Sequence, residues 1–581
     1  MKALLSGNEA IARGAYEAGA RFAAAYPGTP STEILENTAR YKEITSQWSP
    51  NEKVALEVAA GASLGGARAL AAMKHVGLNV AADPLFSLSY LGVNAGLVII
   101  SADDPSLHSS QNEQDNRWYA RAAKIPMLEP ADSQEAKDFT VRAFEISEIF
   151  DTPVLLRTTT RVNHSKGIVQ LSERMEPAER GYKKDISKNV LLPSNARGRH
   201  AFVEERLKKL EEFNNQSDLN QVEWGDRSLG IITSGVAYQY AREVFPQASF
   251  LKLGLTNPLP RKLIQNFAAQ VREIYVIEEL DPFLEEQVKA LGLKVIGKEK
   301  VPLLYELDPQ RVAEAFAVGA SETSEPVLKD LKIPGRPPVL CPGCSHRGIF
   351  YAIKRLKLTA MGDIGCYTLA ALPPLSAMDT CLCMGASVGM ASGMEKAQGK
   401  GKLIAVIGDS TFIHSGITGL IDIVYNKGTT KLCILDNRTT AMTGHQEHPG
   451  TGLTLSGEPT HQLDLEALCR AIGVNRVVKV NPFDISEILH VLKEEMAVDE
   501  PSVIISDGFC IIREGTRLGE PYYVDEELCV ECDLCFQVGC PAIEKSTSGK
   551  AWINPLLCVG CDVCAQVCKP GAILRGEKRA A

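Results

Sequence analysis

The feature that most constrains this chain is a group of closely spaced cysteines toward its C-terminal end. The sequence has 16 cysteines in 581 residues, none before Cys341, and eight of them lie between Cys529 and Cys568. They form two runs, Cys529-x2-Cys532-x2-Cys535-x4-Cys540-Pro541 and Cys558-x2-Cys561-x2-Cys564-x3-Cys568-Lys569-Pro570. In a cytosolic chain, clustered cysteines indicate metal binding rather than disulfides.

Two runs of this kind fit a pair of [4Fe-4S] clusters. The second run has the bacterial spacing, and the first has one extra residue before its fourth cysteine. Three thiolates of a run converge on one cluster, and the fourth leads into a helix and reaches the other cluster. This gives two sets, which we call the Cys529 set (Cys529, Cys532, Cys535, Cys568) and the Cys540 set (Cys540, Cys558, Cys561, Cys564). Zinc is the alternative, but four-sulfur zinc sites need only two cysteine pairs.

Length and composition describe an ordinary globular protein. A chain of 581 residues with 45% hydrophobic and 23% charged residues supports three or four domains. The net charge of -9 argues against nucleic acid as the main partner. The first residues reach Asn8 and Glu9 before any long apolar run, which argues against a signal peptide. No apolar run has bilayer length, so we expect a soluble cytoplasmic protein that does not enter a membrane.

A strand–helix–strand unit is predicted from Leu403 to Asn437. Apolar runs end at Gly408 and Leu435, and a helical apolar face lies between them. The two strands should be parallel neighbours, so Asp409 and Asn437 would meet at the edge where open parallel sheets bind ligands. A carboxylate and an amide oxygen suit Mg²⁺. From these residues alone, a purely structural crossover is an equally good interpretation.

Two features near the N-terminus are candidates for a second half of the site. Thr29 follows a short apolar strand and could cap a helix that begins at Pro30, where backbone N–H groups could hold an anion; a simple turn is the alternative. Glu57 lies among small apolar residues, so we expect a buried carboxyl with a raised pKa. The alternative is that Glu57 faces solvent.

Further candidates are less specific. Arg121, one helical turn after Arg117, could clamp a carboxylate, although solvated arginines are the commoner outcome. The helix that starts near Met384-Gly385-Ala386-Ser387 could bind a diphosphate at its N-terminus. His445 lies in a polar loop after Asn437 and could meet substrate, or could simply be exposed. Residues 168–222 are expected to be a linker with one solvated helix, and Ser321 to Pro338 a second linker.

Three features together resemble a known family: Tyr26-Pro27-Gly28-Thr29-Pro30-Ser31, Gly408-Asp409 followed by Asn437, and the two cysteine runs. They are similar to the 2-oxoacid:ferredoxin oxidoreductases, and more narrowly to the large (alpha) subunits of those that act on indolepyruvate. Ser410 stands where the family usually has a second glycine. The resemblance implies an α/β multidomain chain with doubly wound parallel sheets. The implied domains are 1–180 (pyrimidine-binding), 222–320 (transketolase-C-terminal-like), 335–519 (diphosphate-binding) and 520–581 (2×[4Fe-4S] ferredoxin-like).

The resemblance also implies the activity, the oxidative decarboxylation of aryl pyruvates such as indole-3-pyruvate to aryl-acetyl-CoA and CO₂, with reduction of ferredoxin. It implies thiamine diphosphate and Mg²⁺, the ion bound by Asp409, Asn437 and the Thr439 carbonyl. Glu57 would hydrogen-bond the aminopyrimidine. The implied catalytic residues are Glu57, Thr29, Arg121 and His445. The implied cofactor-binding residues are Glu57, Met384, Gly385, Ala386, Gly408, Asp409, Ser410, Asn437 and Met442.

Relatives hold a further cluster that begins with a Cys-Pro-Gly-Cys pair. Here Cys341, Cys344, Cys366 and Cys510 occupy similar places, and we call them the Cys341 set. A third [4Fe-4S] cluster and free or zinc-bound thiols both remain open. The family also implies a smaller beta subunit in a heterotetramer, with coenzyme A as co-substrate. The alternatives are a related enzyme for another 2-oxoacid, or an electron-transfer subunit whose partner performs the chemistry.

Overall fold

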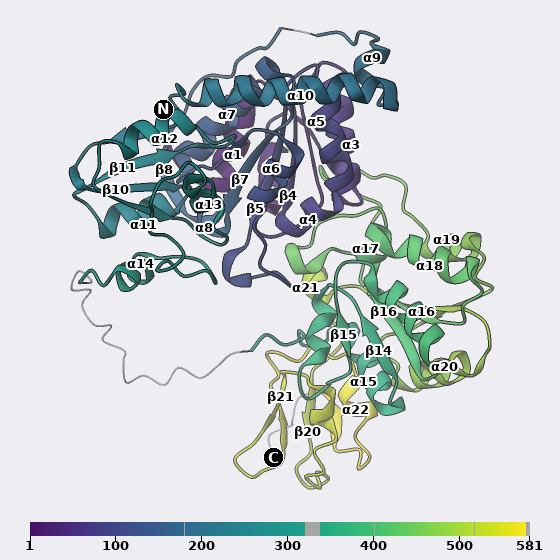
Figure 1. The fold of residues 1–581 in the computed structure, drawn as a ribbon. Helices are drawn as coiled ribbons and strands as arrows, with labels where there is room; N and C mark the ends of the chain where they lie inside the picture. The colour runs from purple at the N-terminus through teal and green to yellow at the C-terminus, as the bar shows by residue number, and fades with distance from the viewer. Residues whose placement is uncertain (179, 320–336, 400, 516, 577–581) are drawn as a thin grey trace. The chain divides into compact units, whose positions relative to one another are not determined.

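The computed structural model describes residues 1–178, 180–319, 337–399, 401–515 and 517–576 (Figure 1). The chain divides into two compact units, Met1–Leu331 and Lys332–Ala581, which we call unit 1 and unit 2. The linker predicted from Ser321 to Pro338 lies outside the described residues except for its last two. The finer domain boundaries remain predictions.

Unit 1 is built on a seven-stranded sheet with the order β12-β6-β7-β5-β4-β2-β3. Its strands are β2 (Phe22–Ala25), β3 (Thr45–Trp48), β4 (Ala69–Lys74), β5 (Leu97–Asp103), β6 (Met127–Leu128), β7 (Val154–Thr159) and β12 (Leu255–Asn257). Neighbouring strands are parallel except for β12, which pairs antiparallel with β6. Residues of β4 and β5 are buried on both faces, as expected for a parallel sheet covered by helices.

Helices cover this sheet. They are α1 (Gly7–Glu17), α2 (Thr32–Thr38), α3 (Glu52–Leu64), α4 (His75–Val80), α5 (Ala82–Leu91), α6 (Arg117–Ala123), α7 (Ser133–Phe150) and α8 (Thr160–His164). Leu56 of α3 and Leu85 of α5 share a core cluster with Met73 and Ile99 of the sheet. Helices α1 and α7 pack against each other, and α7 also contacts β5 and β7. Strands β1 (Lys2–Ser6) and β8 (Lys166–Gln170) form an antiparallel ribbon.

A four-stranded sheet with the order β13-β10-β11-β9 completes unit 1. Its strands are β9 (Gln221–Glu223), β10 (Asp226–Ser234), β11 (Ala248–Leu253) and β13 (Glu273–Ile277), with helices α11 (Ala237–Val244), α12 (Arg261–Ala268), α13 (Phe283–Lys289) and α14 (Pro309–Phe316). The expected linker over 168–222 contains α9 (Ile186–Asn189) and α10 (Pro193–Asn214). Helix α10 is not a fully solvated helix, because it buries Val203 and Leu210 and its Arg206 donates to the Ser89 carbonyl at 2.9 Å.

Unit 2 contains a six-stranded parallel sheet with the order β15-β14-β16-β17-β19-β18. Its strands are β14 (Thr359–Gly362), β15 (Thr380–Cys381), β16 (Leu403–Gly408), β17 (Lys431–Asp436), β18 (Arg476–Val480) and β19 (Ser502–Asp507). One core cluster joins the sheet to α15 (His346–Leu356) and α20 (Ile485–Ala497), and another joins it to α16 (Ala386–Gln398), α18 (Ile417–Tyr425) and α19 (Leu465–Ile472). The predicted α/β class with parallel sheets is confirmed.

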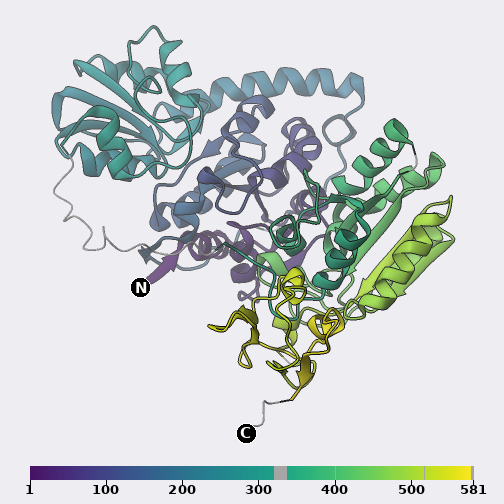
Figure 2. The ribbon, with the colours of Figure 1, turned by 90° about the horizontal axis from the view of Figure 1, so that it is seen from below.

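The C-terminal part of unit 2 has short elements (yellow in Figure 2). Strands β20 (Tyr522–Val524) and β23 (Ile573–Arg575) pair antiparallel, as do β21 (Ile543–Lys545) and β22 (Ala551–Ile553). The helical turns η5 (Cys535–Val538) and α22 (Val563–Gln566) each carry a cysteine of the two runs. Val538 and Val563 share a core cluster with Ile349 of α15, so this part packs on that helix.

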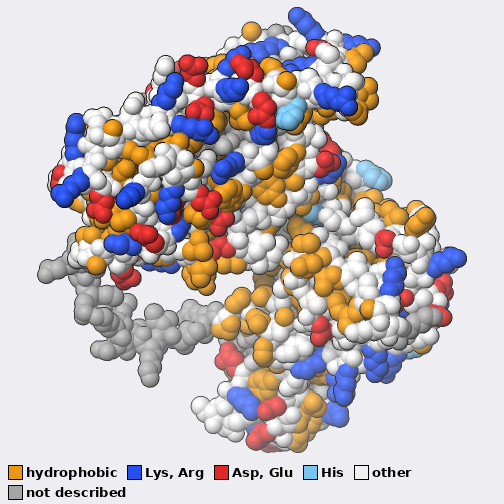
Figure 3. Space-filling model, in the orientation of Figure 1, with side chains coloured by type: hydrophobic (Ala, Val, Ile, Leu, Met, Phe, Trp, Pro, Cys, Tyr) orange, Lys and Arg blue, Asp and Glu red, His pale blue; other side chains and the backbone are white. Residues whose placement is uncertain are grey.

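The surface carries both signs of charge. On the face drawn in Figure 3, Lys and Arg side chains are interspersed with Asp and Glu over unit 1. In the described residues, no helix combines the length and the apolar character that crossing a membrane requires.

Candidate functional site

Three neighbouring strands of unit 2 bring polar side chains to one sheet edge. Asp363 follows β14, Asp409 follows β16 and Asn437 follows β17, and these strands are parallel neighbours. Asp409 and Asn437 are 3% and 8% exposed. The backbone N–H of Arg438 donates to Asp409 Oδ2 at 2.8 Å, so the two strand ends are in contact. The structure therefore brings together the two side chains that the sequence placed at this edge.

The oxygen groups at this edge fit a hard divalent cation. Burial acts to raise the pKa of Asp409, but the neighbouring His448, with Nε2 3.3 Å from Asp409 Oδ2, contributes to a net pKa below the ordinary value. Thr439 is buried, and its hydroxyl has no hydrogen-bond partner among the described residues. An ionised carboxylate, the Asn437 amide oxygen and the Thr439 carbonyl would make half of a Mg²⁺ shell.

Two buried aromatic side chains order the edge. Burial lowers the pKa of His346 to about 4, so its ring is neutral, and its Nε2 lies 3.4 Å from Asn437 Nδ2. The amide can donate there and leave its oxygen for a cation. Tyr367 packs edge-on against His346 at 5.8 Å. Its hydroxyl accepts from the Gly408 N–H at 2.9 Å and donates to the Ile364 carbonyl at 2.9 Å, which fixes the turn before Asp409.

The N-terminus of α16 differs from the prediction. The N–H groups of Gly385 and Ser387 both donate to the carboxylate of Asp363, each at 2.9 Å, and the Ala386 N–H donates to the Cys383 carbonyl at 3.0 Å. These amides, expected to be open for a diphosphate, are therefore satisfied within the chain. Sequence reasoning missed Asp363, although its position directly after a buried strand was the available signal.

The loop after β17 holds two other predicted residues, His445 and Met442. His445 is half-buried, burial and the Arg513 charge lower its pKa, and its Nδ1 has no hydrogen-bond partner in the described part of the chain. Met442 is 51% exposed. The Thr440 hydroxyl donates to Ser410 Oγ at 2.9 Å, which ties this loop to the turn at Asp409. His448, which pairs with Asp409, lies in the same loop and was not predicted as a functional residue.

In unit 1, the prediction that the Glu57 carboxyl is buried is wrong. The Glu57 side chain is 45% exposed and forms an ion pair with Lys53 one turn earlier in α3. The apolar neighbours misled the prediction because they occupy the other side of the helix, where Leu56, Ala59 and Ala60 are buried. Glu57 is a solvated residue of unit 1.

A different acid of α3, Glu52, is buried at the edge of the sheet. It is 4% exposed and opens the helix four residues after the end of β3. It lies so close to Gly77 that a Cβ on that glycine would be 2.6 Å from Glu52 Oε1. The turn before it is set by Asn51, whose side chain accepts from the Val54 N–H at 2.9 Å. The sequence feature that could have identified Glu52 is an acidic residue at the start of a helix, shortly after a strand.

Thr29 follows β2, the strand between β3 and β4, so it lies at the same edge as Glu52. Its predicted role as a helix cap is wrong, because α2 begins at Thr32 after a turn in which the Gly28 N–H donates to Thr32 Oγ1 at 2.9 Å. Pro30 lies within that turn. Thr29 itself is half-buried, and its carbonyl accepts from Ser109 Oγ at 3.4 Å.

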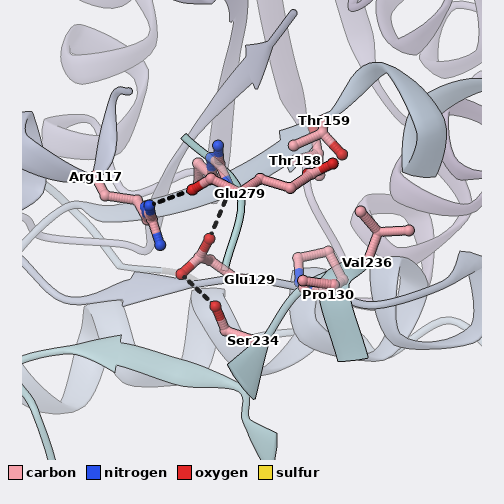
Figure 4. A pocket seen from close by; sticks show the side chains of 11 residues that line it. Arg117, Glu129, Pro130, Thr158, Thr159, Ser234, Val236 and Glu279 are labelled. Carbon is pink, nitrogen blue, oxygen red and sulfur yellow. Dashed lines mark hydrogen bonds and ion pairs between the residues drawn. The ribbon is translucent and has the colours of Figure 1, made fainter. Parts of the chain in front are cut away.

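The two arginines of α6 have separate environments. Arg121 is exposed and lies over the Trp118 ring, 5.4 Å from its centre. Arg117 is buried and pairs with Asp115 and Glu278 at 2.6 Å each, so its charge is matched inside unit 1. Figure 4 shows Arg117 beside Glu129, Glu279 and Ser234 in a small cavity.

The cysteines of the C-terminal part gather around two cavities. One cavity is lined by Cys529, Cys532, Cys535 and Cys568, and the other by Cys540, Cys558, Cys561 and Cys564. These are the two crossed sets that the spacing predicted. Among the described residues, no group of three or more His, Cys, Asp or Glu side chains is placed to hold a single metal ion. Thiols around a wider cavity fit a cubane cluster in each.

The Cys341 set is also brought together. Burial raises the pKa of Cys344 to about 12, and the nearby Cys341 and Cys366 act in the same direction. Burial likewise raises the pKa of Cys366 to about 11, with Cys510 and Cys341 acting in the same direction. The Cys510 N–H donates to the Asn437 carbonyl at 3.1 Å. This set therefore lies directly beside the edge that holds Asp409 and Asn437.

Comparison with known proteins gives two family matches. Residues 13–203 match the family described as "Pyruvate flavodoxin/ferredoxin oxidoreductase, thiamine diP-bdg". Residues 363–506 match "Thiamine pyrophosphate enzyme, C-terminal TPP binding domain". The second match includes the strand ends that carry Asp363, Asp409 and Asn437.

Curated relatives match over nearly the whole chain. "Indolepyruvate oxidoreductase subunit IorA" of Archaeoglobus fulgidus is 45% identical, covering 93% of this chain and 92% of the relative. The protein of the same description from Methanothermobacter thermautotrophicus is 42% identical over 98% and 97% of the two chains. The one from Pyrococcus horikoshii is 41% identical over 98% and 96%.

Proposed function

This chain belongs to the family of the indolepyruvate oxidoreductase subunits IorA, and from that premise we propose that it carries the site at which an aryl pyruvate is oxidatively decarboxylated. It is an oxidoreductase with thiamine-diphosphate-binding domains. The substrates are indole-3-pyruvate or a close relative and coenzyme A, and the products are an aryl-acetyl-CoA, CO₂ and reduced ferredoxin. The observation that carries the proposal is the contact between the Asp409/Asn437 edge and the Cys341 set, through the Cys510 N–H and the Asn437 carbonyl.

Thiamine diphosphate, when bound, supplies the carbon nucleophile and the electron sink for decarboxylation of a 2-oxoacid. Asp409, Asn437 and the Thr439 carbonyl would hold the Mg²⁺ that accompanies its diphosphate. His448 keeps Asp409 ionised, and His346 orients the Asn437 amide. These residues bind and position; they do not themselves react.

Glu52, rather than Glu57, is proposed as the acid that hydrogen-bonds the aminopyrimidine. Its burial supports this role, because a carboxyl that exchanges a proton with a bound ring must be shielded from water. Thr29 at the same sheet edge is retained as a proposed contact for the substrate carboxylate. Arg121 and His445 are proposed as further contacts for the substrate, and Met442 as a contact for the cofactor; each is exposed or half-buried.

Three [4Fe-4S] clusters are proposed in unit 2. The Cys341 set adjoins the Asn437 edge. Pro342 and Gly343, between Cys341 and Cys344, also line the cavity of the Cys540 set. The Cys529 set shares both cysteine runs with the Cys540 set, and its Cys532 is exposed. Clusters held by these three sets would supply a relay for electrons between the Asn437 edge and ferredoxin. Iron analysis tests the number: about twelve irons per chain are expected, and about eight would remove the third cluster.

A smaller beta subunit is proposed as the partner in a heterotetramer, because the relatives are described as subunits. The test is a comparison of turnover by the complex with indolepyruvate, phenylpyruvate, pyruvate and 2-oxoglutarate, with coenzyme A and ferredoxin present. Fastest turnover with the two aryl pyruvates is expected. Faster turnover of pyruvate or 2-oxoglutarate would assign another 2-oxoacid. Reducible clusters without decarboxylation of any substrate would make the chain an electron-transfer subunit.

A further inference from the structure

Arg347, the second residue of α15, is buried between two of the cysteine sets. It is 2% exposed. Its Nη1 donates to the carbonyls of Val538 at 2.9 Å and Gly539 at 2.5 Å, and its Nη2 donates to those of Leu340 at 2.7 Å and Cys341 at 2.8 Å. The guanidinium thus binds the segment that opens the Cys341 set and the segment that leads to Cys540.

Among the described residues, no side chain neutralises the charge of this arginine. All four of its hydrogen bonds go to backbone carbonyls, and within the described part of the chain no carboxylate forms an ion pair with it. Buried charges are normally paired, because removing an ion from water costs several kcal/mol. The carbonyls satisfy Nη1 and Nη2, whereas Nε has no hydrogen-bond partner among the described residues, and carbonyl dipoles do not neutralise the charge. A negatively charged centre close to Arg347 would do so.

The extra residue of the first cysteine run takes part in this contact. The four residues between Cys535 and Cys540 end the turn η5 with Gly539, whose φ of +70° reverses the chain. Val538 and Gly539 then present their carbonyls to Arg347. A Cβ on Gly539 would lie 3.1 Å from Pro374 and 3.4 Å from Arg347 Nη1. The segment that contains the extra residue of the first cysteine run is therefore the segment whose carbonyls bind the Arg347 guanidinium.

The charge lies beside cysteines of both sets. Arg347 follows Cys344 by three residues, and its Nη2 binds the carbonyl of Cys341, so it adjoins the Cys341 set. Its Nη1 binds the carbonyl of Gly539, the residue directly before Cys540 of the Cys540 set.

We propose that Arg347 is a positioning residue that sets the reduction potentials of the clusters held by the Cys341 set and the Cys540 set. The inference rests on the proposed function, because it requires clusters at these cysteines. Each cluster gains one negative charge when it accepts an electron from substrate oxidation, and it loses that charge when the electron passes toward ferredoxin. A fixed positive charge in a low-dielectric site stabilises the reduced form, so it raises both potentials.

The test is an EPR-monitored redox titration of the complete complex, with iron analysis of each sample. R347Q removes the charge, R347K keeps it with fewer donors, and R355Q removes an exposed arginine from the same helix as the matched control. We expect R347Q to lower both potentials by at least about 59 mV, which corresponds to a tenfold fall in the equilibrium constant for a one-electron reduction. R347K and R355Q should stay near wild type. The Cys529 cluster should shift least.

Three results would overturn the inference. Unchanged potentials in R347Q with full iron would show that the charge has no effect. An equal fall in R347K and R347Q would assign the effect to the hydrogen bonds rather than the charge. If R347Q failed to retain iron, the potentials of R347K would be the test. Loss of iron in R347K as well would show that Arg347 is needed to hold the structure around the cysteines rather than to set the potentials. A wild type with only two cluster signals would contradict the proposed third cluster instead, while the Cys540 cluster would still report on Arg347.

Discussion

At the scale of single residues, two glutamates of α3 show how a five-residue difference in position changes a side chain's environment. Glu52 opens the helix at the sheet edge and is buried, whereas Glu57 lies one and a half turns later and faces solvent. Local apolar composition is shared by both and does not distinguish them. The strand end that precedes Glu52 does, because side chains there are enclosed by neighbouring strands and loops.

We expect E52Q to lower kcat for decarboxylation at least about 100-fold, since it removes a group that exchanges a proton with the cofactor. E57Q, the matched control in the same helix, should stay within about twofold of wild type, because it removes only an exposed ion pair with Lys53, and such pairs contribute little. CO₂ release by the complete complex at saturating thiamine diphosphate is the measurement. The reverse order of effects would restore Glu57 as the acid.

His75 should make unit 1 sensitive to acid. It is fully buried, and burial together with the Lys74 charge lowers its pKa from 6.5 to about 4. As pH falls from 6.5 toward 4, the unfolded chain takes up a proton that the folded chain refuses, so stability is lost in that range. The shift corresponds to up to about 3 kcal/mol.

Urea unfolding midpoints at pH 7 and pH 5 test this prediction. H75Q should lose less stability between the two pH values than wild type does. H200Q changes an exposed histidine of the same unit and should behave like wild type. A loss in H75Q as large as in wild type would contradict the assignment to His75.

At the scale of elements, the β16–β17 crossover was predictable because each strand is a buried apolar run and parallel neighbours share an edge. The start of α2 was not, since Thr29 and Pro30 have suitable cap chemistry and only the three-dimensional turn places the helix at Thr32. The hydrogen bonding at the N-terminus of α16 could not be predicted from the neighbouring residues in the sequence either. The N–H groups of Gly385 and Ser387 donate to Asp363, which is 22 residues before Gly385 in the sequence. The two segments come together because β14, before Asp363, and β15, before Gly385, are parallel neighbours.

Replacing Asp363 should weaken the start of α16. D363A leaves the part-buried Gly385 N–H and the buried Ser387 N–H without their acceptor, so we expect a loss of about 1–2 kcal/mol in the free energy of unfolding. D379A is the control, because Asp379 is exposed and accepts from one backbone group, the Ala360 N–H, at 2.7 Å. Urea unfolding without cofactor measures both. Tighter binding of thiamine diphosphate by D363A would revive the original prediction that these amides receive its diphosphate.

At the scale of the whole molecule, the cysteine spacing predicted the grouping in unit 2 well. The crossed membership of Cys540 and Cys568 follows from the reach of each run, and the two cavities have that membership. The Cys341 set could be proposed only by resemblance, because Cys366 and Cys510 are far apart in sequence. Their approach depends on the sheet, which brings the segments after β14 and β19 to one edge.

We expect C510A to remove about four irons per chain and to leave about eight, because only the Cys341 set loses a ligand. C383A replaces an exposed cysteine outside the three sets and should keep about twelve. Iron analysis with EPR of the reduced complex measures both variants. Equal iron in C510A and wild type would leave Cys510 as a free thiol.

The exchange of one cysteine between the two C-terminal runs has a consequence for biogenesis. The Cys540 set is complete only when the polypeptide has been made through Cys564, and the Cys529 set only when it has been made through Cys568. A nascent chain that carries only the first run therefore lacks thiols of both sets, and we expect both clusters to be inserted after the second run has been synthesised.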